Sequence, residues 1–446
     1  MEIKSDISNC MWPAIPTDAG AHALAAQYQL QASQWMSAEE LRTAGLRQLQ
    51  RVLEVSLENV PHWAAALQEI NFQPGKALAF EDFRRLPLLT RTAVQDLGDG
   101  LLNRNLPVGH GRLQRGSTSG STGTPVTFYK TDLTRHFWRA FTLREHLWHK
   151  RDLSARLAAI RSNVEDATWP SWGPATDEVF RTGPSSTLNI RADIDRQLDW
   201  LAQEDPDYLI THPSNLKALA MRAIERGLRL PRLKQLRSFG EVLSNDTREL
   251  CRQAWGAEIA DTYSAEETGY IALQCPLGAY HVQAESLMVE ILDAKGVPCA
   301  PGEIGRVVLT TLHNFAMPLL RYDIGDFARV GATCACGRGL PVLQQILGRV
   351  RNMLKLPDGS QHWPSFPEDR WAHIAPIRQV QVVQKKLDEI VLRVVSTRVL
   401  SDEERGKLID TFRDTLRFPH RIDIERVESI PRGSNFKFED FRSEVA

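Results

Sequence analysis

Cysteine, net charge and long hydrophobic runs are all scarce in this sequence, and each scarcity excludes a class of protein. Six cysteines among 446 residues are too few for a disulfide scaffold. The 54 basic and 55 acidic residues leave a net charge of −1, which offers no broad attraction to nucleic acid or to an acidic membrane. No run of about eighteen apolar residues occurs, so a membrane-spanning helix is not expected.

The first residues, Met1 to Asp6, lack the apolar stretch of a signal peptide, and we expect a cytoplasmic protein with no nucleic-acid or membrane partner. Internal repeats and low-complexity blocks are absent as well. The remaining composition, 42% hydrophobic and 24% charged, is ordinary for a globular chain. Because 446 residues exceed one typical core, two or more domains are expected.

Hydrophobic periodicity predicts mixed helices and strands over most of the chain. Ser37 and Glu40 form a capping-box pattern before a helix that reaches Val60, and a second helix is expected over 133–148. Short runs rich in apolar and β-branched residues indicate strands at 208–210, 288–292 and 307–309. This pattern favours an α/β fold in which helices pack on β-sheets.

The C-terminal part carries a pattern of its own. Alternating or helically spaced apolar residues predict a hairpin within 380–394, a helix over 401–416 and a strand at 422–424. These elements can bury one small core. We therefore expect a boundary near Gly348–Arg349, between a large N-terminal domain (1–347) and a small α+β C-terminal lid domain (348–446).

The most informative stretch is a loop rich in glycine and hydroxyl residues. From Gly116 to Gly123, three glycines accompany five serines or threonines, so backbone amides and hydroxyls can surround phosphate oxygens. The candidate phosphate-binding residues are Ser117, Thr118, Ser119, Gly120, Ser121, Thr122 and Gly123. A flexible linker is the alternative reading. Against it, the run is short and leads through Pro125 into the strand-like segment 126–129, and it lacks the Gly-Lys-Ser/Thr ending of nucleoside-triphosphatase loops.

This loop resembles the phosphate loop of the adenylate-forming superfamily, which includes acyl-CoA synthetases and adenylation domains. The run Leu86–Arg91 also fits the phenylacetate–CoA ligase branch of that superfamily. Matching segments follow in the family's order along nearly the whole chain. The resemblance implies a large adenylate-forming domain with a mobile C-terminal domain, ATP and Mg²⁺ in the site, and coenzyme A as the expected acceptor.

Two further motifs resemble the family's adenine-binding segments. Gly240 and Glu241 match the Gly-Glu loop that lines the adenine. The resemblance implies that Tyr263 stacks on adenine and that Glu267 holds magnesium, a hard cation that prefers oxygen ligands. The family's threonine before this glutamate is Glu266 here, and without the resemblance a Glu-Glu pair is more typical of a solvated helix face.

The segment Arg321–Asp326 resembles the family's Tyr-x-Thr-Gly-Asp motif, in which the aspartate accepts both ribose hydroxyls. A plain β-turn is the alternative, because Asp-x-Gly-Asp is favourable turn chemistry. Downstream, Gly348–Arg349 matches the family's hinge, and the resemblance implies that Arg349 also reaches the ribose. Val350 follows where family members usually have an acidic residue.

The tail segment Ile430–Phe438 resembles the family's Pro-Arg-x-x-Gly-Lys-Phe. The resemblance makes Lys437 the lysine that docks on the α-phosphate and the acyl carboxylate, and it completes the expected catalytic set with Glu267 and Arg349. A fixed ammonium offsets the repulsion between two anions in a site that excludes water. Phe436 stands where the family has glycine, and a lone lysine near a C-terminus is otherwise typical of solvated surface.

Three cysteines and one histidine stand beside these motifs, namely Cys275, His281, Cys334 and Cys336. Three sulfurs and one nitrogen form a tetrahedral zinc site with no open position, so the zinc would be structural. Some members of the resembled branch carry zinc at similar positions. Four unrelated residues are the alternative, which the spacing does not reject.

The acid itself is weakly specified. The resemblance implies a pocket built from region 137–172 and the residues around Gly240. One interpretation is an aromatic pocket of Phe137, Trp138, Phe141, Trp169 and Trp172. Helical spacing favours core positions for Phe137 and Phe141. An aryl or arylalkanoic acid is implied by the family alone.

We therefore expect an enzyme that converts ATP and a small carboxylic acid to an acyl-adenylate and pyrophosphate. The acyl group then passes to a thiol, for which coenzyme A is the expected acceptor. The small domain would rotate about Arg349 and withdraw Lys437 to admit the thiol. An acyl carrier protein or an amine is an alternative acceptor. A catalytically inactive nucleotide-binding homologue is the other alternative, and the departures at Phe436 and Val350 motivate it. The oligomeric state is open, and a homodimer is one of the alternatives.

Overall fold

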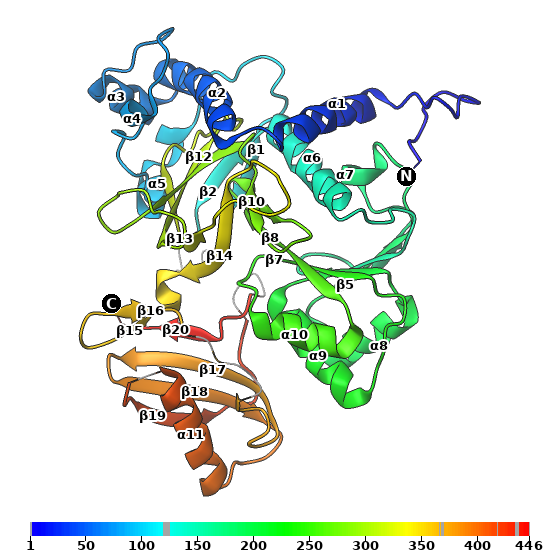
Figure 1. The fold of residues 1–446 in the computed structure, drawn as a ribbon, viewed down its shortest axis with the longest axis vertical. Coiled ribbons are helices and arrows are strands. Elements are labelled where there is room, and N and C mark those ends of the chain that lie inside the picture. Colours follow the sequence, from blue (N-terminus) through cyan, green and yellow to red (C-terminus); the bar gives the residue numbers. More distant parts are fainter. Residues whose placement is uncertain are drawn as a thin grey trace.

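The structure, a computed structural model, describes residues 2–118, 125–364, 366, 370–416, 418–432 and 437–445. It contains a large α/β part and a smaller part built on its own sheet, which lies at the lower left in Figure 1. Helices pack on β-sheets in the large part, and the small part is α+β, so the predicted fold class is confirmed. None of the described helices is both long and apolar enough to cross a membrane.

A twelve-stranded sheet forms the centre of the large part. Five adjacent strands run parallel, in the order β5 (Ser185–Asn189), β3 (Leu157–Arg161), β6 (Tyr208–Thr211), β7 (Gln235–Phe239) and β8 (Glu258–Ala265). The antiparallel strands are β4 (Ala167–Trp169) beside β5 and, beyond β8 in order, β9 (Gly269–Gln274), β10 (Tyr280–Val282), β14 (Val342–Arg349), β13 (Tyr322–Val330), β12 (Ile304–Thr311) and β11 (Leu287–Leu292). Every residue of β6 is buried, because a central parallel strand is covered on both faces.

Helices cover both faces of the parallel strands. The apolar residues of α8 (Ile194–Glu204), α9 (Pro213–Arg226) and α10 (Asn245–Trp255) pack against one face. On the opposite face lies α6 (Asp132–Trp148), whose Glu145 pairs with Arg237 of β7. Leu236 packs on the α8–α10 side, as the alternation of side chains along a strand requires.

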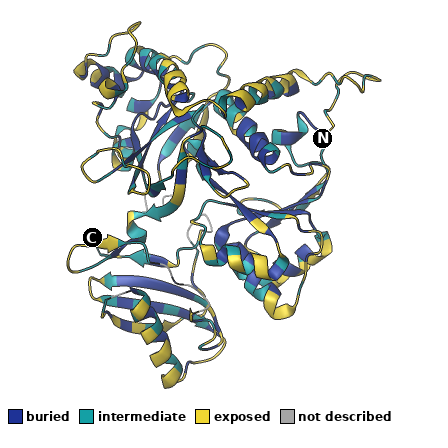
Figure 2. Ribbon diagram, in the orientation of Figure 1, coloured by how far each residue is buried: buried dark blue, intermediate teal, exposed yellow. Residues whose placement is uncertain are grey.

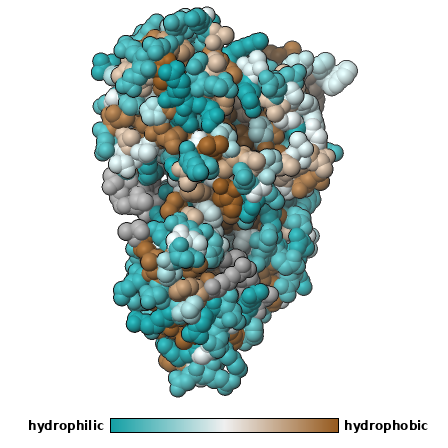
Figure 3. Space-filling model, turned by 60° about the vertical axis from the view of Figure 1, so that its left-hand side comes forward, coloured by the Kyte–Doolittle hydropathy of each residue, from teal (hydrophilic) through white to brown (hydrophobic). Residues whose placement is uncertain are grey.

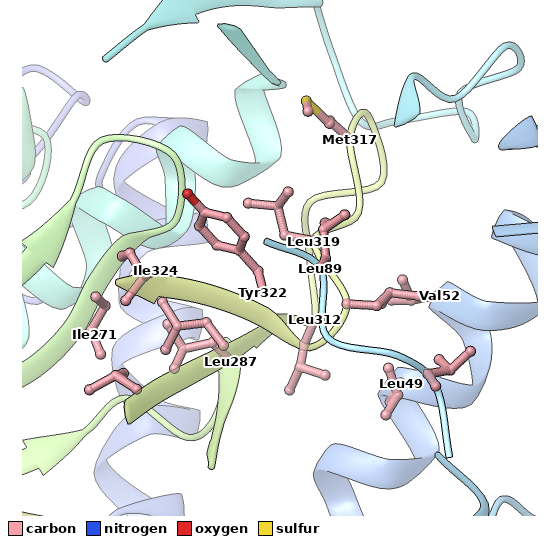
Figure 4. Packing of buried hydrophobic residues seen from close by; sticks show 14 of the residues in the cluster. Leu49, Val52, Leu89, Ile271, Leu287, Leu312, Met317, Leu319, Tyr322 and Ile324 are labelled. Carbon is pink, nitrogen blue, oxygen red and sulfur yellow. The ribbon is translucent and has the colours of Figure 1, made fainter. Parts of the chain in front are cut away.

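The antiparallel strands carry the largest core, under α2 (Ala38–Asn59), α3 (Pro61–Glu69) and α5 (Arg91–Leu97). Leu49 and Val52 of α2 belong to one buried cluster with Leu89 and Tyr322 (Figure 4). Burial of each such side chain stabilises the fold by about 1.5–3 kcal/mol. The predicted capping box at the start of α2 is present. The remaining helices of this part are α1 (Asp18–Ser33), α4 (Phe80–Phe83), η1 (Gly98–Leu101) and α7 (Pro174–Asp177).

A hairpin holds the two ends of the predicted phosphate loop. Strands β1 (Gln114–Ser117) and β2 (Thr127–Lys130) pair antiparallel, with Ser117 opposite Thr127. Residues 119–124, between the strands, lie outside the described residues.

The small part folds around its own core. The four-stranded sheet has the order β19 (Arg421–Arg426), β18 (Glu389–Ser396), β17 (Ile377–Lys386), β20 (Phe441–Ser443). Helix α11 (Asp402–Leu416) buries Leu408, Phe412 and Leu416, the predicted four-residue spacing, and its outer side is exposed (Figure 2). The connection from the large part consists of η2 (Val350–Asn352), β15 (Leu354–Lys355) and β16 (Gln361–His362). The proposed boundary after residue 347 falls two residues before the end of β14.

Candidate active site

A cleft of about 1930 Å³ lies between the large and small parts. Its walls include residues that follow β6, β7 and β8, residues at the end of β14, and residues of the C-terminal tail. Figure 3 shows a mostly hydrophilic face with several small groups of hydrophobic residues. The cleft therefore lies where the carboxyl ends of parallel strands meet, the usual ligand position in open α/β sheets.

The turn after β7 brings the small part close to the sheet. Gly240 has a φ of +82°, a conformation that favours glycine. A Cβ at this position would lie 3.3 Å from the ring of His212 and 3.4 Å from Cε of Lys437. The tail thus lies within van der Waals distance of this turn, and the positive φ of Gly240, rather than crowding by Lys437, favours glycine here.

Asp326 brings two other predicted residues together. The hydroxyl of Tyr263 donates to Oδ2 of Asp326 at 2.9 Å, and Nε of Arg349 donates to Oδ1 at 3.2 Å. Asp326 and Arg349 are paired across β13 and β14, so the sheet register holds them opposite each other. Burial raises the pKa of Tyr263, and the neighbouring Asp326 raises it further, so this phenol stays a donor.

The acidic pair after β8 divides into one buried and one exposed side chain. Glu267 is only 4% exposed and accepts a hydrogen bond from the hydroxyl of Tyr322 at 3.3 Å, whereas Glu266 is exposed. Both glutamates line the cleft. Burial raises the pKa of Tyr322, and Glu267 raises it further. Within the described part of the chain no hydrogen bond to the second oxygen of Glu267 is recorded, and a carboxylate oxygen suits a hard cation such as Mg²⁺.

Lys437 lines the same cleft from the tail, and its side chain is exposed to solvent at the cleft surface. Desolvation by surrounding protein atoms lowers the pKa of this lysine, and Arg349 lowers it further, while Asp326 and the glutamates of the cleft oppose the shift. The ammonium thus stands in a site that already contains another cation. An anionic ligand would relieve this repulsion.

Hydrogen bonds tie the tail to the large part. The carboxylate of Glu241 accepts from the backbone N–H of Phe438 at 2.7 Å and from the N–H and Oγ of Ser214 at 2.9 and 3.1 Å. Arg432 donates to Oγ of Ser214 at 2.7 Å. Glu241 lines the cleft as well. The residue expected to line the adenine therefore also joins the two parts.

The residues that depart from the family pattern after Arg349 contact the tail. Arg351 forms an ion pair with Glu439, and Nδ2 of Asn352 donates to the carbonyl oxygen of Phe441 at 2.8 Å. Arg349 N–H donates to Oδ1 of Asn352 at 3.3 Å. The segment at the proposed hinge is thus bonded to the strand that follows Lys437.

The described end of the phosphate loop is held by the β1–β2 hairpin. Thr118 N–H donates to the carbonyl of Val126 at 2.9 Å, and Val126 N–H donates to Oγ1 of Thr118 at 3.0 Å. Arg91 also donates to Oγ1 of Thr118, at 3.0 Å. Thr118 lines the cleft, and Ser117 is exposed at the end of β1. The predicted phosphate-binding residues Ser119, Gly120, Ser121, Thr122 and Gly123 lie outside the described residues.

The predicted zinc ligands come together away from the Asp326 cluster. The ligand atoms of Cys275, His281, Cys334 and Cys336 all lie within 4.8 Å of one another. The sulfurs of Cys275 and Cys334 are 3.8 Å apart, and Cys336 Sγ is 3.3 Å from Nε2 of His281. Burial lowers the pKa of His281 to about 4, so its ring is neutral at physiological pH. Three sulfurs and one neutral imidazole in this proximity fit a tetrahedral metal site.

The five aromatic residues considered for the acid pocket have different surroundings. Phe137 and Phe141 pack in a hydrophobic cluster, as the helical spacing favours. Trp138 is 43% exposed and, of the five, is the one that lines the cleft among the described residues. Trp172 donates to the carbonyl of Ala155, and Trp169 is exposed elsewhere. Of the five, Trp138 alone therefore stays a candidate for the acid pocket.

No family model matches the sequence. The chain is 26% identical over 403 residues to the phenylacetate–coenzyme A ligase of Thermus thermophilus, covering 82% of this chain and 85% of that protein. It is 24% identical over 429 residues to the Escherichia coli protein of the same name, covering 89% and 93%. Over most of its length the chain is therefore distantly homologous to phenylacetate–coenzyme A ligases. Its fold matches that of adenylate-forming enzymes.

Among solved structures, the superfamily fold recurs in 2-hydroxyisobutyryl-CoA ligase. Its postadenylation state with R3-HIB-AMP superposes with a TM-score of 0.73 at 20% identity, covering 92% of this chain and 91% of that chain. The thioesterification state of that ligase, with 2-HIB-AMP and CoA, gives 0.59 at 21% identity, covering 93% and 91%. At this level of identity the likeness shows a shared fold.

Lys130 is a cleft residue that the motifs of the superfamily did not indicate. It ends β2, lines the cleft and lies over the ring of Phe128, with Nζ 4.9 Å from the centroid. Burial lowers the pKa of Lys130, and the charges of Glu267 and Glu266 oppose that shift. The run from Gly116 to Gly123 contains no lysine or arginine. This absence was the only sign in the sequence that a positive charge beside the phosphate loop would have to come from another segment.

Proposed function

We propose that this protein activates a small carboxylic acid with ATP as an enzyme-bound acyl-adenylate and then transfers the acyl group to the thiol of coenzyme A. The observation that carries the proposal is that Tyr263, Glu267, Asp326, Arg349 and Lys437, which are far apart in the sequence, line one cleft. Its relationship to acid–coenzyme A ligases supports the same reaction class.

In the first step, a carboxylate oxygen attacks the α-phosphorus of ATP, a P–O bond forms and pyrophosphate leaves. Lys437 would neutralise the two anions that approach each other, and desolvation of the cleft strengthens that effect. Asp326 and Arg349 would orient the ribose, while Tyr263 and the loop at Gly240 would hold the adenine. Glu267 would bind Mg²⁺, which supplies charge neutralisation at the phosphates.

In the second step, the thiol attacks the acyl carbon and AMP leaves. This step needs access to the acyl group from the side where Lys437 would lie, so the small part would rotate about Arg349. The contacts of Glu241 with Phe438 and of Ser214 with Arg432 would break during that rotation. Coenzyme A is the proposed acceptor, and a carrier-protein thiol or an amine is the competing one.

We also propose that Cys275, His281, Cys334 and Cys336 bind a structural zinc ion. The donor set fills a tetrahedral coordination sphere, so the ion would staple β9 and β10 to the loop before β14 rather than take part in the reaction. His281 is completely buried and directs Nδ1 at the carbonyl of Leu340, at 3.4 Å, which leaves Nε2 for the metal.

Acid-dependent ATP–pyrophosphate exchange with a panel of acids tests the proposal. Lys437→Ala should reduce exchange by about 100-fold or more, because a cation at the reacting phosphate is worth several kcal/mol. ATP should still bind. Lys407→Ala, on the exposed side of α11, is the matched control and should leave exchange unchanged. Equal exchange rates in Lys437→Ala and in the wild type would show that the lysine takes no part in the reaction.

Discharge of the preformed acyl-adenylate identifies the acceptor. Free coenzyme A, a phosphopantetheine-bearing carrier protein and a simple amine are added separately to enzyme loaded with acid and ATP. Thioester formation with coenzyme A is the expected outcome. Discharge by the carrier protein or the amine alone would reassign the second step and retain the first.

A further inference from the structure

Arg161, the last residue of β3, is a partly buried arginine that no described residue neutralises. Its Nε is out of contact with water and has no hydrogen-bond partner among the described residues. The guanidinium lies over the ring of Phe239, with Cζ 5.0 Å from the centroid. A cation–π contact compensates only part of the hydration that a buried guanidinium loses.

The charges around Arg161 do not compensate it. Burial lowers the pKa of Arg161, and the neighbouring Arg237 lowers it further. Arg237 pairs with Glu145 of α6, but the same carboxylate also binds Arg151 at 2.6 Å. One glutamate thus serves two arginines, and within the described part of the chain Arg161 has no carboxylate partner. A partly buried cation without a carboxylate partner is a candidate for binding an anionic ligand.

Arg161 stands at the edge of the sheet where the cleft opens. Strands β3 and β6 are neighbours, and if their pairing is continued past the last paired residues, Arg161 lies opposite His212. If the pairing of β6 with β7 is continued in the same way, His212 lies opposite Phe239. His212, Phe239 and also Ser162, the residue after Arg161, line the cleft. The arginine is therefore adjacent to the cleft wall rather than in a separate part of the core.

The same region is the far end of the proposed acid site. Phe239 directly precedes Gly240, the residue that Lys437 approaches. Trp138 of α6 also lines the cleft, and its ring stacks on Tyr270 with the centroids 5.8 Å apart. An acid whose reacting carboxylate lies at Lys437 would thus meet Trp138 and Phe239 in the cleft lining, with Arg161 in contact with the ring of Phe239.

We propose that Arg161 binds a second carboxylate of the substrate, so that the acid activated here is a dicarboxylic acid that reacts at one end only. This inference rests on the proposed function, because it requires the reacting carboxylate to lie at Lys437. A second carboxylate supplies the negative charge that Arg161 lacks. The planar guanidinium can donate parallel hydrogen bonds to its two oxygens.

Matched pairs of acids test the inference in the exchange assay. Phenylacetate is compared with 4-carboxyphenylacetate, and butyrate with glutarate. We expect each diacid to have a kcat/KM about 10- to 100-fold above that of its monoacid partner, the range of one charge-assisted contact. Arg161→Met, which keeps an unbranched side chain and removes the charge, should abolish this preference. Arg161→Lys should keep part of it, and Arg413→Met on the exposed surface of α11 should keep all of it.

The outcomes separate the inference from the proposed function. Wild-type exchange that favours the monoacids, with the same ratio in Arg161→Met, overturns the dicarboxylic acid and leaves acid activation standing. Absence of exchange with every acid counts against the proposed function. In that case calorimetric titration with glutarate and 4-carboxyphenylacetate still decides the role of Arg161, because equal binding by the wild type and Arg161→Met, or no binding to either, overturns it.

Discussion

The carboxylate of Glu241 accepts a hydrogen bond from the backbone N–H of Phe438 at 2.7 Å. Glu241 follows β7 in the large part, whereas Phe438 follows Lys437 in the tail. One carboxylate therefore joins the turn of Gly240 to the segment that delivers the lysine. Ser214, at the start of α9, also donates hydrogen bonds to this carboxylate. The contact is therefore anchored on a helix of the large part.

Glu241→Ala should slow acyl-adenylate formation more than thioester formation. The change removes a charge-assisted hydrogen bond to the tail, worth about 1.5–3 kcal/mol, or about 10- to 150-fold in the population of the arrangement that holds Lys437 in place. Exchange kinetics report the first step, and single-turnover thioester formation from preformed acyl-adenylate reports the second. Glu249→Ala, an exposed change on α10, is the control. Equal loss in both steps would contradict a role confined to the first arrangement.

Asp326→Ala should weaken ATP binding by about 10- to 100-fold, because an ionised acceptor for the ribose hydroxyls is lost. Isothermal titration with ATP measures the change directly. Asp323→Asn is the matched control on the same strand, since Asp323 bonds Arg306 and the N–H of Gly325 rather than lining the cleft. An unaltered ATP affinity in Asp326→Ala would exclude the ribose role.

Cys334→Ser should lower the zinc content and the melting temperature, by about 5 °C or more, because a structural metal contributes directly to folding free energy. Elemental analysis of the purified protein and differential scanning calorimetry provide the two readouts. Cys299→Ser is the control, since Cys299 lies outside the cluster. A wild-type protein without stoichiometric zinc, together with a mutant of equal stability, would contradict the proposed zinc site.

Stability should fall between about pH 6.5 and pH 4 because of His149. Burial, together with the neighbouring Arg151, lowers the pKa of His149 to about 4, whereas an unfolded histidine titrates near pH 6.5. Its Nε2 faces the carbonyl of Gln274 at 2.9 Å and its Nδ1 faces the side-chain amide of Gln235 at 3.0 Å, so the neutral ring is satisfied. Below pH 6.5 the unfolded state takes up a proton that the folded state does not, which favours unfolding.

The expected loss is about 1–3 kcal/mol across this interval. Chemical denaturation of the wild type and of His149→Gln, measured at several pH values, checks it. The mutant should be less stable near pH 7, because its hydrogen bonds are imperfect, but its stability should depend less on pH. Parallel pH profiles for the two proteins would assign the acid sensitivity to other groups.

Local elements could be predicted where a single period dominates the sequence. The capping pair Ser37 and Glu40, and the four-residue spacing of Leu408, Phe412 and Leu416, indicated α2 and α11 without tertiary information. The Cys–His cluster was also predictable, because metal-ligand residue types beside convergent motifs are few. Its four side chains are indeed near one another. The roles proposed for the site residues, unlike their positions, stay predictions.

The acid site could not be predicted in the same way. Trp138 and Phe141 are both aromatic residues of α6, yet one lines the cleft and the other is buried, because helix rotation rather than residue type sets their surroundings. Likewise, Glu241 resembles a nucleotide-loop residue, and its sequence context contains no sign that it would bond Phe438.

The amino-acid sequence was sufficient for the fold class, the motif order and the chemistry of the candidate residues, because these depend on residue type and short-range spacing. Packing determined which charges are compensated. Arg161 and Arg237 look alike in the sequence, but Glu145 pairs with Arg237 and not with Arg161. The reason is physical: the cost of a buried charge depends on which partner lies within a few ångströms, and that partner comes from a distant segment of the chain.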